Sequence, residues 1–239
     1  MSSTFELLLA HLQEDPLMIL MMLTSVFIVA VAMERLLMMV RGFWALRAVE
    51  GRILSPLRAG RFEEARLGCR AVGVPIRDVF AAGLDRALGK VKGDPGMAIA
   101  REQRRATAVY RNWLWILGTA GALMPFVGLL GTVVGVMGSF RAIGESGQGG
   151  FAVVSSGISQ ALIATAVGLF VALEAVILFN FLQNLAGSIS RRLAYAADEA
   201  LELIRVRADA PVPAAALLPG TVTPTHIPAG GENAGSAAK

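Results

Sequence analysis

The sequence has little of the chemistry on which most enzymes and metalloproteins depend. Its single cysteine, Cys69, excludes an intramolecular disulfide and a cysteine-built metal site, and two histidines supply few other ligands or nucleophiles. Charged residues make up only 17% of the 239 positions, whereas about 25% is typical of soluble domains. We therefore predict no cofactor, no metal, no covalent catalytic step, and too little polar surface for a soluble domain.

Apolar residues, 55% of the chain, are concentrated in three blocks that predict transmembrane helices at 16–40, 113–140 and 152–185. Each block approaches or exceeds the roughly 20 residues that a helix needs to cross a hydrocarbon core of about 30 Å. The first block is not a secretory signal, because no Lys or Arg precedes it and it ends at Glu34–Arg35 rather than at a small-residue cleavage site. The fold class is therefore an all-α membrane protein with three spans.

Basic residues are distributed unevenly along the chain and predict its orientation. Most of the 22 Lys and Arg residues lie in 41–112, while none precedes residue 16. The positive-inside rule places the N-terminus outside and both 41–112 and the C-terminus in the cytoplasm. Because topology accounts for the basic charge, we predict no nucleic-acid partner. The predicted segments outside the spans are an extracytoplasmic N-terminal segment 1–15, a cytoplasmic helical insert 41–112, an extracytoplasmic connection 141–151, a cytoplasmic helix 186–209 and a disordered cytoplasmic tail 210–239.

Helix signals extend both later spans into the cytoplasm. Asp94 followed by Pro95 is typical of a helix start, and no breaker follows before Gly118, which predicts one helix from about 95 to 140. The third span is expected to continue as an amphipathic helix through 188–207. Shorter helices are predicted around 43–54, 61–71 and 75–89, packed on these two long helices.

Small residues lie on one face of the second span and one face of the third. At about 100° per residue the members of each face lie within about 60° of one another. Such faces allow helices to approach closely in lipid, so they serve either simple helix packing or a pore that holds another helix. The residues are Gly121, Gly128, Gly135 and Ser139 in the second span, with Pro125 close by, and Ala161, Gly168 and Ala172 in the third.

Four polar side chains in the spans are the candidate functional residues. Thr132 and Thr165 place hydroxyls on the small faces, either to meet another helix or to bond back to their own helix. Glu174 lies within an apolar run, where an ionised carboxylate costs about 2.5–3.5 kcal/mol, so it is a functional candidate by default. Its structural alternative is a hydrogen bond to Thr24 or Ser25. Gln160, near the outer end of the third span, fits either role.

Two motifs in these spans resemble the ExbB/TolQ/MotA proton-channel family, most closely its ExbB and TolQ members. The second span contains Pro125-Phe-Val-Gly-Leu-Leu-Gly-Thr132-Val-Val-Gly-Val-Met137-Gly-Ser-Phe140. The third contains Gly157-Ile-Ser-Gln-Ala-Leu-Ile-Ala-Thr165-Ala-Val-Gly-Leu169, followed by Asn180. The number of spans, their orientation and the large insert also agree, so the resemblance covers roughly residues 10–207.

The resemblance implies a homopentameric ring in the bacterial inner membrane whose second and third spans line a central pore. Two copies of a single-span ExbD/TolR-like partner would occupy this pore, each with an aspartate as proton carrier. Thr132 and Thr165 would be the pore hydroxyls that face the aspartate, and the ring would contact membrane lipid on its outside. Such a stator converts proton motive force into mechanical work, as in TonB or Tol energisation or in a gliding motor.

Two positions depart from the family pattern. Gln160 stands where ExbB and TolQ usually carry glutamate, and Glu174 stands where they usually carry proline. Fourteen residues place these two side chains about 40° apart on the helix, whereas Thr165 and Glu174 are about 180° apart. We hypothesise that the wall carboxylate has moved inward along the third span.

Two other functions remain open at this point. A helical membrane scaffold would use the small faces only for packing and would have no single-span partner with an aspartate. A secondary transporter is less favoured, because the sequence has no inverted repeat and only one buried carboxylate. A sodium-driven motor is also less favoured than a proton-driven one, because no side chains form a clear sodium cage.

Overall fold

The described part of the chain is built from helices alone. The computed structural model describes the backbone of residues 16–146 and 151–209, with side chains for 16–144 and 155–207, and no strand occurs in these ranges. The predictions for the N-terminal segment 1–15 and the tail 210–239, and part of that for the connection 141–151, lie outside the described residues.

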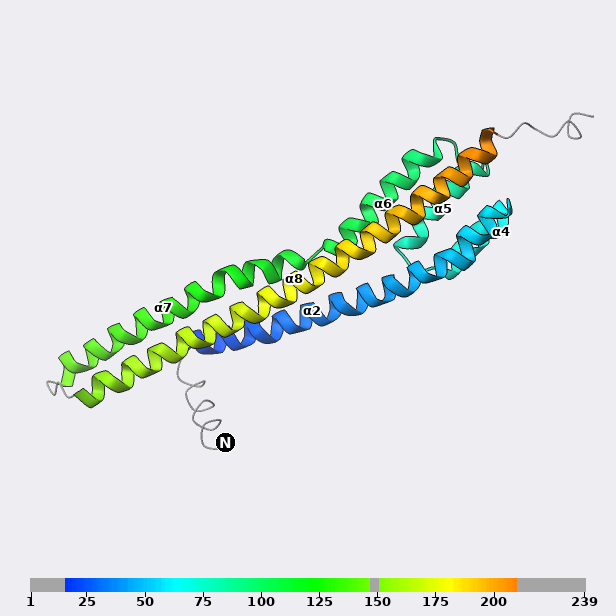
Figure 1. Ribbon diagram of the computed structural model, residues 1–239. Helices are drawn as coiled ribbons and strands as arrows, with labels where there is room; N and C mark the ends of the chain where they lie inside the picture. Colours follow the sequence, from blue (N-terminus) through cyan, green and yellow to red (C-terminus); the bar gives the residue numbers. More distant parts are fainter. Residues whose placement is uncertain (1–15, 147–150, 210–239) are drawn as a thin grey trace, which may run out of the picture. The chain divides into compact units, whose positions relative to one another are not determined.

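One long helix, α8, runs through most of the structure, with a second along one part of it and a third along another, all three side by side in the middle (Figure 1). They are α2 (Pro16–Val49), α7 (Leu114–Ser146) and α8 (Phe151–Asp209). Helix α8 has 59 residues, which at about 1.5 Å per residue is about 88 Å. One uninterrupted helix therefore contains both the third apolar block and the predicted continuation through 188–207.

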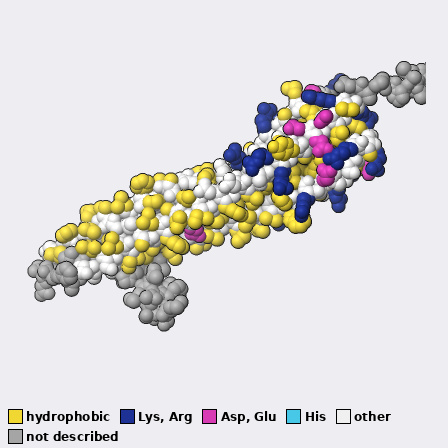
Figure 2. Space-filling model, viewed as in Figure 1, with side chains coloured by type: hydrophobic (Ala, Val, Ile, Leu, Met, Phe, Trp, Pro, Cys, Tyr) yellow, Lys and Arg dark blue, Asp and Glu magenta, His cyan; other side chains and the backbone are white. Residues whose placement is uncertain are grey.

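All three apolar blocks lie in helices long and apolar enough to cross a membrane. This confirms the all-helical membrane fold with three spans. Figure 2 shows the same division on the surface, because hydrophobic side chains cover the part built from α7 and the neighbouring parts of α2 and α8, whereas charged side chains gather over the α5 and α6 end. The edges of the spans stay predictions, because α2 and α8 continue past the predicted boundaries without a break.

The helix predicted from 95 to 140 is wrong in one respect, because it is broken between α6 (Pro95–Arg111) and α7. Its start is as expected: Asp94 accepts a hydrogen bond from the Met97 amide at 2.6 Å, and Pro95 occupies the first turn. Helix α6 ends at Arg111 with Asn112 as its C-cap, and Trp113 has a φ of 69°, which is uncommon for a bulky residue. No proline or glycine marks this break, so sequence pattern did not reveal it.

Short helices in the insert connect α2 to α6. They are η1 (Glu50–Leu54, a π-helix), α3 (Ser55–Arg58), α4 (Phe62–Gly68), η2 (Cys69–Ala71, a 3₁₀ helix) and α5 (Ile76–Ala87). The helix predicted at 43–54 is not separate, because α2 continues directly into η1 and α3, with Pro56 tolerated in the first turn of α3.

Glycines end two of these helices in the manner expected of left-handed caps. Gly60 and Gly89 have φ values of 72° and 70°, which cost glycine little. After Gly89, the Lys90 amide donates to the Asp85 carbonyl at 2.9 Å, and the residues around Gly60 repeat this pattern. Both ends therefore form Schellman motifs, which stop α3 and α5 and turn the chain back.

The core of the insert is built from large side chains of α5, α6 and the distal part of α8. Phe80 and Ile99 are buried, as is Ile204 of α8. Gly83 brings these helices together, because a methyl group on it would lie 2.5 Å from the Ile99 side chain and 3.8 Å from that of Ile204. The insert thus packs on α8, which joins it to the spans.

Candidate functional site

Helices α7 and α8 touch backbone to backbone along the predicted small faces. A methyl group placed on Gly168 would lie 2.8 Å from Gly128 Cα, and one on Gly135 would lie 2.9 Å from the Ala161 side chain. Near the other end, one on Gly121 would lie 3.5 Å from the Ala172 carbonyl oxygen. The small residues of the two spans therefore face each other within one chain, as the packing interpretation requires.

Ser139 and Pro125 complete this contact at different levels. Ser139 is buried, donates to the Gly135 carbonyl at 2.9 Å, and leaves no room for a side chain at Gly157 of α8. Pro125 lies inside α7 and supplies no amide hydrogen to the carbonyl of residue 121. For all of these residues, a pore-lining role stays a prediction beyond the packing that the contacts show.

The two threonine hydroxyls both donate to carbonyls, but in different ways. Thr132 donates to the Leu129 carbonyl of its own helix at 2.6 Å. Thr165 donates at 2.9 Å to the Gly128 carbonyl of α7, which is a bond between helices. Each hydroxyl hydrogen is thus committed, and each oxygen keeps capacity to accept a hydrogen bond.

Glu174 lies on the other side of α8, against α2. Its Oε2 accepts a hydrogen bond from the Ser25 hydroxyl at 2.8 Å, whereas Thr24 donates to the Leu20 carbonyl of its own helix. The predicted hydrogen bond to Ser25 is therefore present, and the functional role of Glu174 stays a prediction. Because Thr165 and Glu174 are about 180° apart on α8, the α2 side carries Glu174 and the opposite side carries Thr165.

A groove of about 420 Å³ surrounds Glu174 between α2 and α8. Glu174 is the only charged residue that lines it, and the others are apolar: Val29, Ala32, Met33, Leu36, Ile177, Leu178, Phe181 and Leu182. Gln160, exposed and about 40° from Glu174 around the helix, lies fourteen residues before it. The structure therefore joins Thr165 to Gly128, which lies about one turn before Thr132 on α7, and places Glu174 and Gln160 on another face of α8.

Arg35 holds the junction between α6 and α7, a role that sequence reasoning missed. Its guanidinium pairs with Glu34 at 2.5 Å and donates to the carbonyls of Val109 and Asn112 at 3.5 and 3.4 Å. A cation near the last carbonyls of a helix is favourable, because these carbonyls carry the negative end of the helix dipole. The only signal in the sequence was an ion pair at the end of a span.

An ion pair and a thiol in the insert have shifted pKa values outside the spans. The Arg66 guanidinium donates to both oxygens of Asp85, at 2.6 and 2.8 Å, and lowers the pKa of that carboxyl. Burial raises the pKa of the Cys69 thiol to about 11, so it stays protonated at neutral pH. The described residues hold no group of three or more His, Cys, Asp or Glu side chains suited to a metal ion.

Comparison with known protein families gives a match to the MotA/TolQ/ExbB proton channel family over residues 73–194. The match covers half of the chain and includes both threonines, Gln160 and Glu174. The chain belongs to this family. The resemblance to this family is thereby confirmed. The family match and the three apolar helices together support a multi-pass membrane protein.

Curated relatives match part of the chain. The Tol-Pal system protein TolQ of Pseudomonas aeruginosa is 38% identical over 120 residues, covering 44% of this chain and 50% of that protein. The biopolymer transport protein ExbB of Salmonella typhimurium is 42% identical over 106 residues, covering 43% of each chain. The ExbB of Neisseria gonorrhoeae is 52% identical over 68 residues, or 28% of this chain and 31% of that protein. The chain thus spans half or less of the relatives it matches.

Proposed function

We propose that this chain is the channel subunit of a proton-driven stator that works across the cell envelope of a bacterium. The observation that carries the proposal is the placement of Thr132 and Thr165 on the side of the α7–α8 pair away from Glu174, with both oxygens able to accept. Membership of a proton-channel family and relatives named for the Tol-Pal system and for biopolymer transport support the same function.

The partner of these hydroxyls is the aspartate of an ExbD/TolR-like single-span chain. Since both threonine hydrogens already go to carbonyls, the oxygens offer acceptors and no free donor. A protonated carboxyl group can donate to such an acceptor, whereas a carboxylate cannot. The threonine face thus stabilises the neutral form of the aspartate while it passes the apolar wall.

In a homopentamer around two partner helices, the threonine face lines the central pore. Apolar side chains that flank the threonines, such as Leu129 (55% exposed) and Leu169 (53% exposed), remain more than half exposed. In the ring they form the wall along which the partner moves. Each proton that crosses delivers about 2.3 kcal/mol per 100 mV of membrane potential, plus any contribution from the pH gradient.

The location that goes with this function is the bacterial inner membrane, with the N-terminus outside and the insert and C-terminus in the cytoplasm. The outer-envelope process driven is of the TonB or Tol type, or a gliding motor. Reaction of a cysteine introduced at residue 2 and of one at residue 239 with an impermeant reagent, in intact and in opened cells, tests this orientation.

Glu174 and Gln160 form the second part of the proposed pathway, on the α2 side of α8. Ser25 keeps one oxygen of Glu174 in place, and the groove gives this carboxyl a site between two helices. We propose that Glu174 takes the role of the glutamate that ExbB and TolQ usually carry at the Gln160 position. If Glu174→Gln leaves proton-driven function intact while Thr165→Val abolishes it, this part of the proposal is wrong.

The decisive experiment measures proton entry into vesicles that contain the chain and its partner under a membrane potential. Thr165→Val removes the hydroxyl at nearly constant volume, and we expect a loss of proton flux of about tenfold or more, consistent with one lost hydrogen bond. Thr24→Val is the matched control, because that hydroxyl bonds only its own helix on α2. Equal flux in wild type and Thr165→Val would contradict the proposal.

The mass of the purified complex separates the stator from its rivals. A ring of five chains with two partner chains supports the stator, and another ring size contradicts the proposed architecture. A complex without any aspartate-bearing single-span chain, and without proton flux, favours the membrane scaffold.

A further inference from the structure

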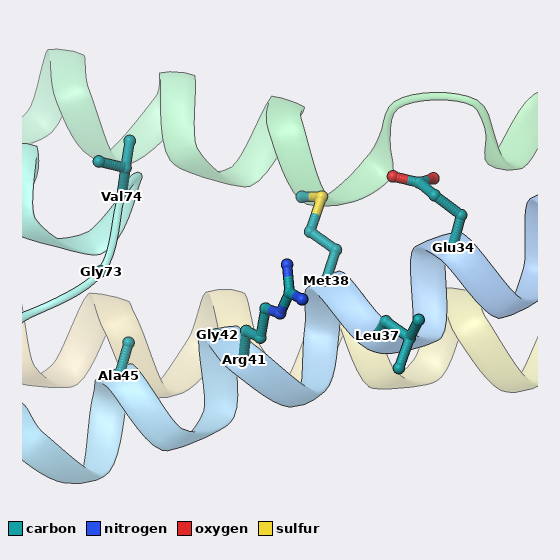
Figure 3. Close-up of a pocket in the computed structure, with 8 residues that line it drawn as sticks. All are labelled: Glu34, Leu37, Met38, Arg41, Gly42, Ala45, Gly73 and Val74. Carbon is teal, nitrogen blue, oxygen red and sulfur yellow. The ribbon is translucent and has the colours of Figure 1, made fainter.

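A second pocket, of about 370 Å³, lies at the opposite end of α2 from Pro16, beside the loop that precedes α5 (Figure 3). In Figure 3 the Arg41 side chain points away from the α2 ribbon into the space beside the segment that carries Gly73 and Val74. The pocket is lined by Glu34, Leu37, Met38, Arg41, Gly42, Ala45, Gly73 and Val74. Its lining combines a cation, a carboxylate and apolar side chains, and the proton pathway uses none of them.

The charges in this pocket favour an anion. Glu34 is neutralised by Arg35, which contacts both of its oxygens at 2.5 and 3.1 Å. Arg41, by contrast, is exposed and forms no hydrogen bond or ion pair with any residue that the structure describes. Among the described residues, the amides of Gly73 and Val74 also have no acceptor. The pocket therefore offers a free guanidinium, and two of its lining residues have backbone amides without an acceptor among the described residues.

The level of the pocket along α2 corresponds to a membrane interface. Arg35 reaches the α6–α7 junction, where the side chains of Trp113 and Trp115 are 48% and 67% exposed, as is typical of residues at the edge of a bilayer. Arg41 lies six residues further along α2, or about 9 Å. That distance from the hydrocarbon edge is close to the depth of a headgroup layer, which is about 5–8 Å on each side.

An apolar strip leads from the pocket toward the middle of the membrane. Leu20, Leu23 and Phe27 lie within about 60° of Arg41 around α2, and their side chains are 51%, 63% and 51% exposed. Leu37, 53% exposed, lies between the strip and Arg41 and lines the pocket. The same face of α2 thus presents Arg41 at the pocket and, beyond the Arg35-paired Glu34, an exposed apolar surface that an acyl chain could cover.

We propose that this pocket binds the phosphate headgroup of an anionic phospholipid, with Arg41 as its main ligand and the strip on α2 as the seat of an acyl chain. Free inorganic phosphate shares the headgroup chemistry but would make no use of the strip. The proposal does not depend on proton conduction, because it uses only the membrane-spanning fold and this pocket.

Native mass spectrometry of the purified complex, titrated separately with phosphatidylglycerol, phosphatidylcholine and inorganic phosphate, tests the proposal. We expect one retained phosphatidylglycerol per chain and weaker retention of phosphatidylcholine. Arg41→Gln should weaken phosphatidylglycerol binding by about fivefold, because one basic side chain is lost near an anionic lipid. Arg41→Lys should restore most of it.

Arg47→Gln is the matched control, because it removes the same charge from the same helix on a face about 120° away, where Arg47 lies 5.7 Å from the Trp44 ring centre. Equal weakening by Arg47→Gln, or equal retention of both lipids, would overturn the proposal. Binding of inorganic phosphate that prevents lipid retention would assign the pocket to a free anion instead. If the wild-type complex conducts no protons but still retains phosphatidylglycerol, only the proposed stator function is contradicted, and the proposed lipid site is not.

Discussion

Helix α8 packs in two different ways along its length, and the difference follows the solvent around it. In the span it meets α7 through glycine and alanine, and a methyl group on Gly168 would lie only 2.8 Å from Gly128 Cα. Beyond the span it meets α5 and α6 through large side chains, with Ile204 buried in one core with Phe80 and Ile99. One helix thus contains two kinds of interface.

The physical reason is that lipid gives no hydrophobic drive for burying large apolar side chains, whereas water does. In the span, close backbone approach maximises van der Waals contact, and large side chains such as Phe126, 68% exposed, point outward. In the insert, burying Phe80 removes apolar area from water, at about 25 cal/mol per Å². The contribution of a side chain to stability therefore depends on which part of α8 it packs against.

The largest expected effect is a core truncation in the insert. Phe80→Ala leaves a cavity where a fully buried ring packed, and we expect a loss of about 3–5 kcal/mol in unfolding free energy. Phe126→Ala, the same change on the exposed face of α7, should cost far less. Thermal melting of the two purified variants checks this contrast, and equal losses of stability would contradict the division between the two interfaces.

A smaller effect is expected from adding one methyl group in the span. Gly168→Ala brings a carbon to 2.8 Å from Gly128 Cα, so α7 and α8 must move apart, at a cost of about 1–3 kcal/mol. Gly138→Ala is the control, because nothing lies within 4 Å of a methyl group there. Melting temperature and proton flux should both fall only for Gly168→Ala. A loss in both variants would point to contacts other than the α7–α8 approach, because alanine favours a helix more than glycine does.

The sequence predicted the pairing of the spans better than it predicted the junctions between helices. Periodicity places Gly128, Gly168 and Ala161 on faces, and helices in lipid with such faces have few other ways to pack. Likewise Asp94 and Pro95 specify a helix start through local backbone chemistry alone.

The parts that could not be predicted depend on contacts between residues distant in sequence. The break at Trp113 is held by Arg35, 77 residues before Asn112, and no local pattern encodes that contact. The partner of the Thr165 hydroxyl, Gly128, was equally hidden, because a back-bond within α8 has the same sequence signal. Ser25 was one of two predicted partners for Glu174, and only the rotation of α2 decides between them.

The smallest expected effect concerns the ion pair that links α4 to α5. Arg66 lowers the pKa of Asp85, so the folded chain binds this proton less readily than the unfolded chain. The pair therefore adds stability above the unfolded pKa of about 3.9, and this contribution disappears as the pH falls through the lower folded pKa. At pH 7 we expect Asp85→Asn to cost about 1 kcal/mol, because both side chains are only partly buried.

Denaturant unfolding at a series of pH values between 7 and 3 measures this difference. Wild type and Asp85→Asn should differ by a constant amount from pH 7 to about pH 5, and the difference should shrink below about pH 4. Asp78→Asn on the same helix is the control, because Asp78 is 45% exposed and pairs only with its neighbour Arg77. A difference that grew on acidification would show that burial, rather than Arg66, dominates the titration of Asp85. Stability in the insert would then depend on excluding water, as it does at Phe80, and charge pairing would add little even where polar side chains meet.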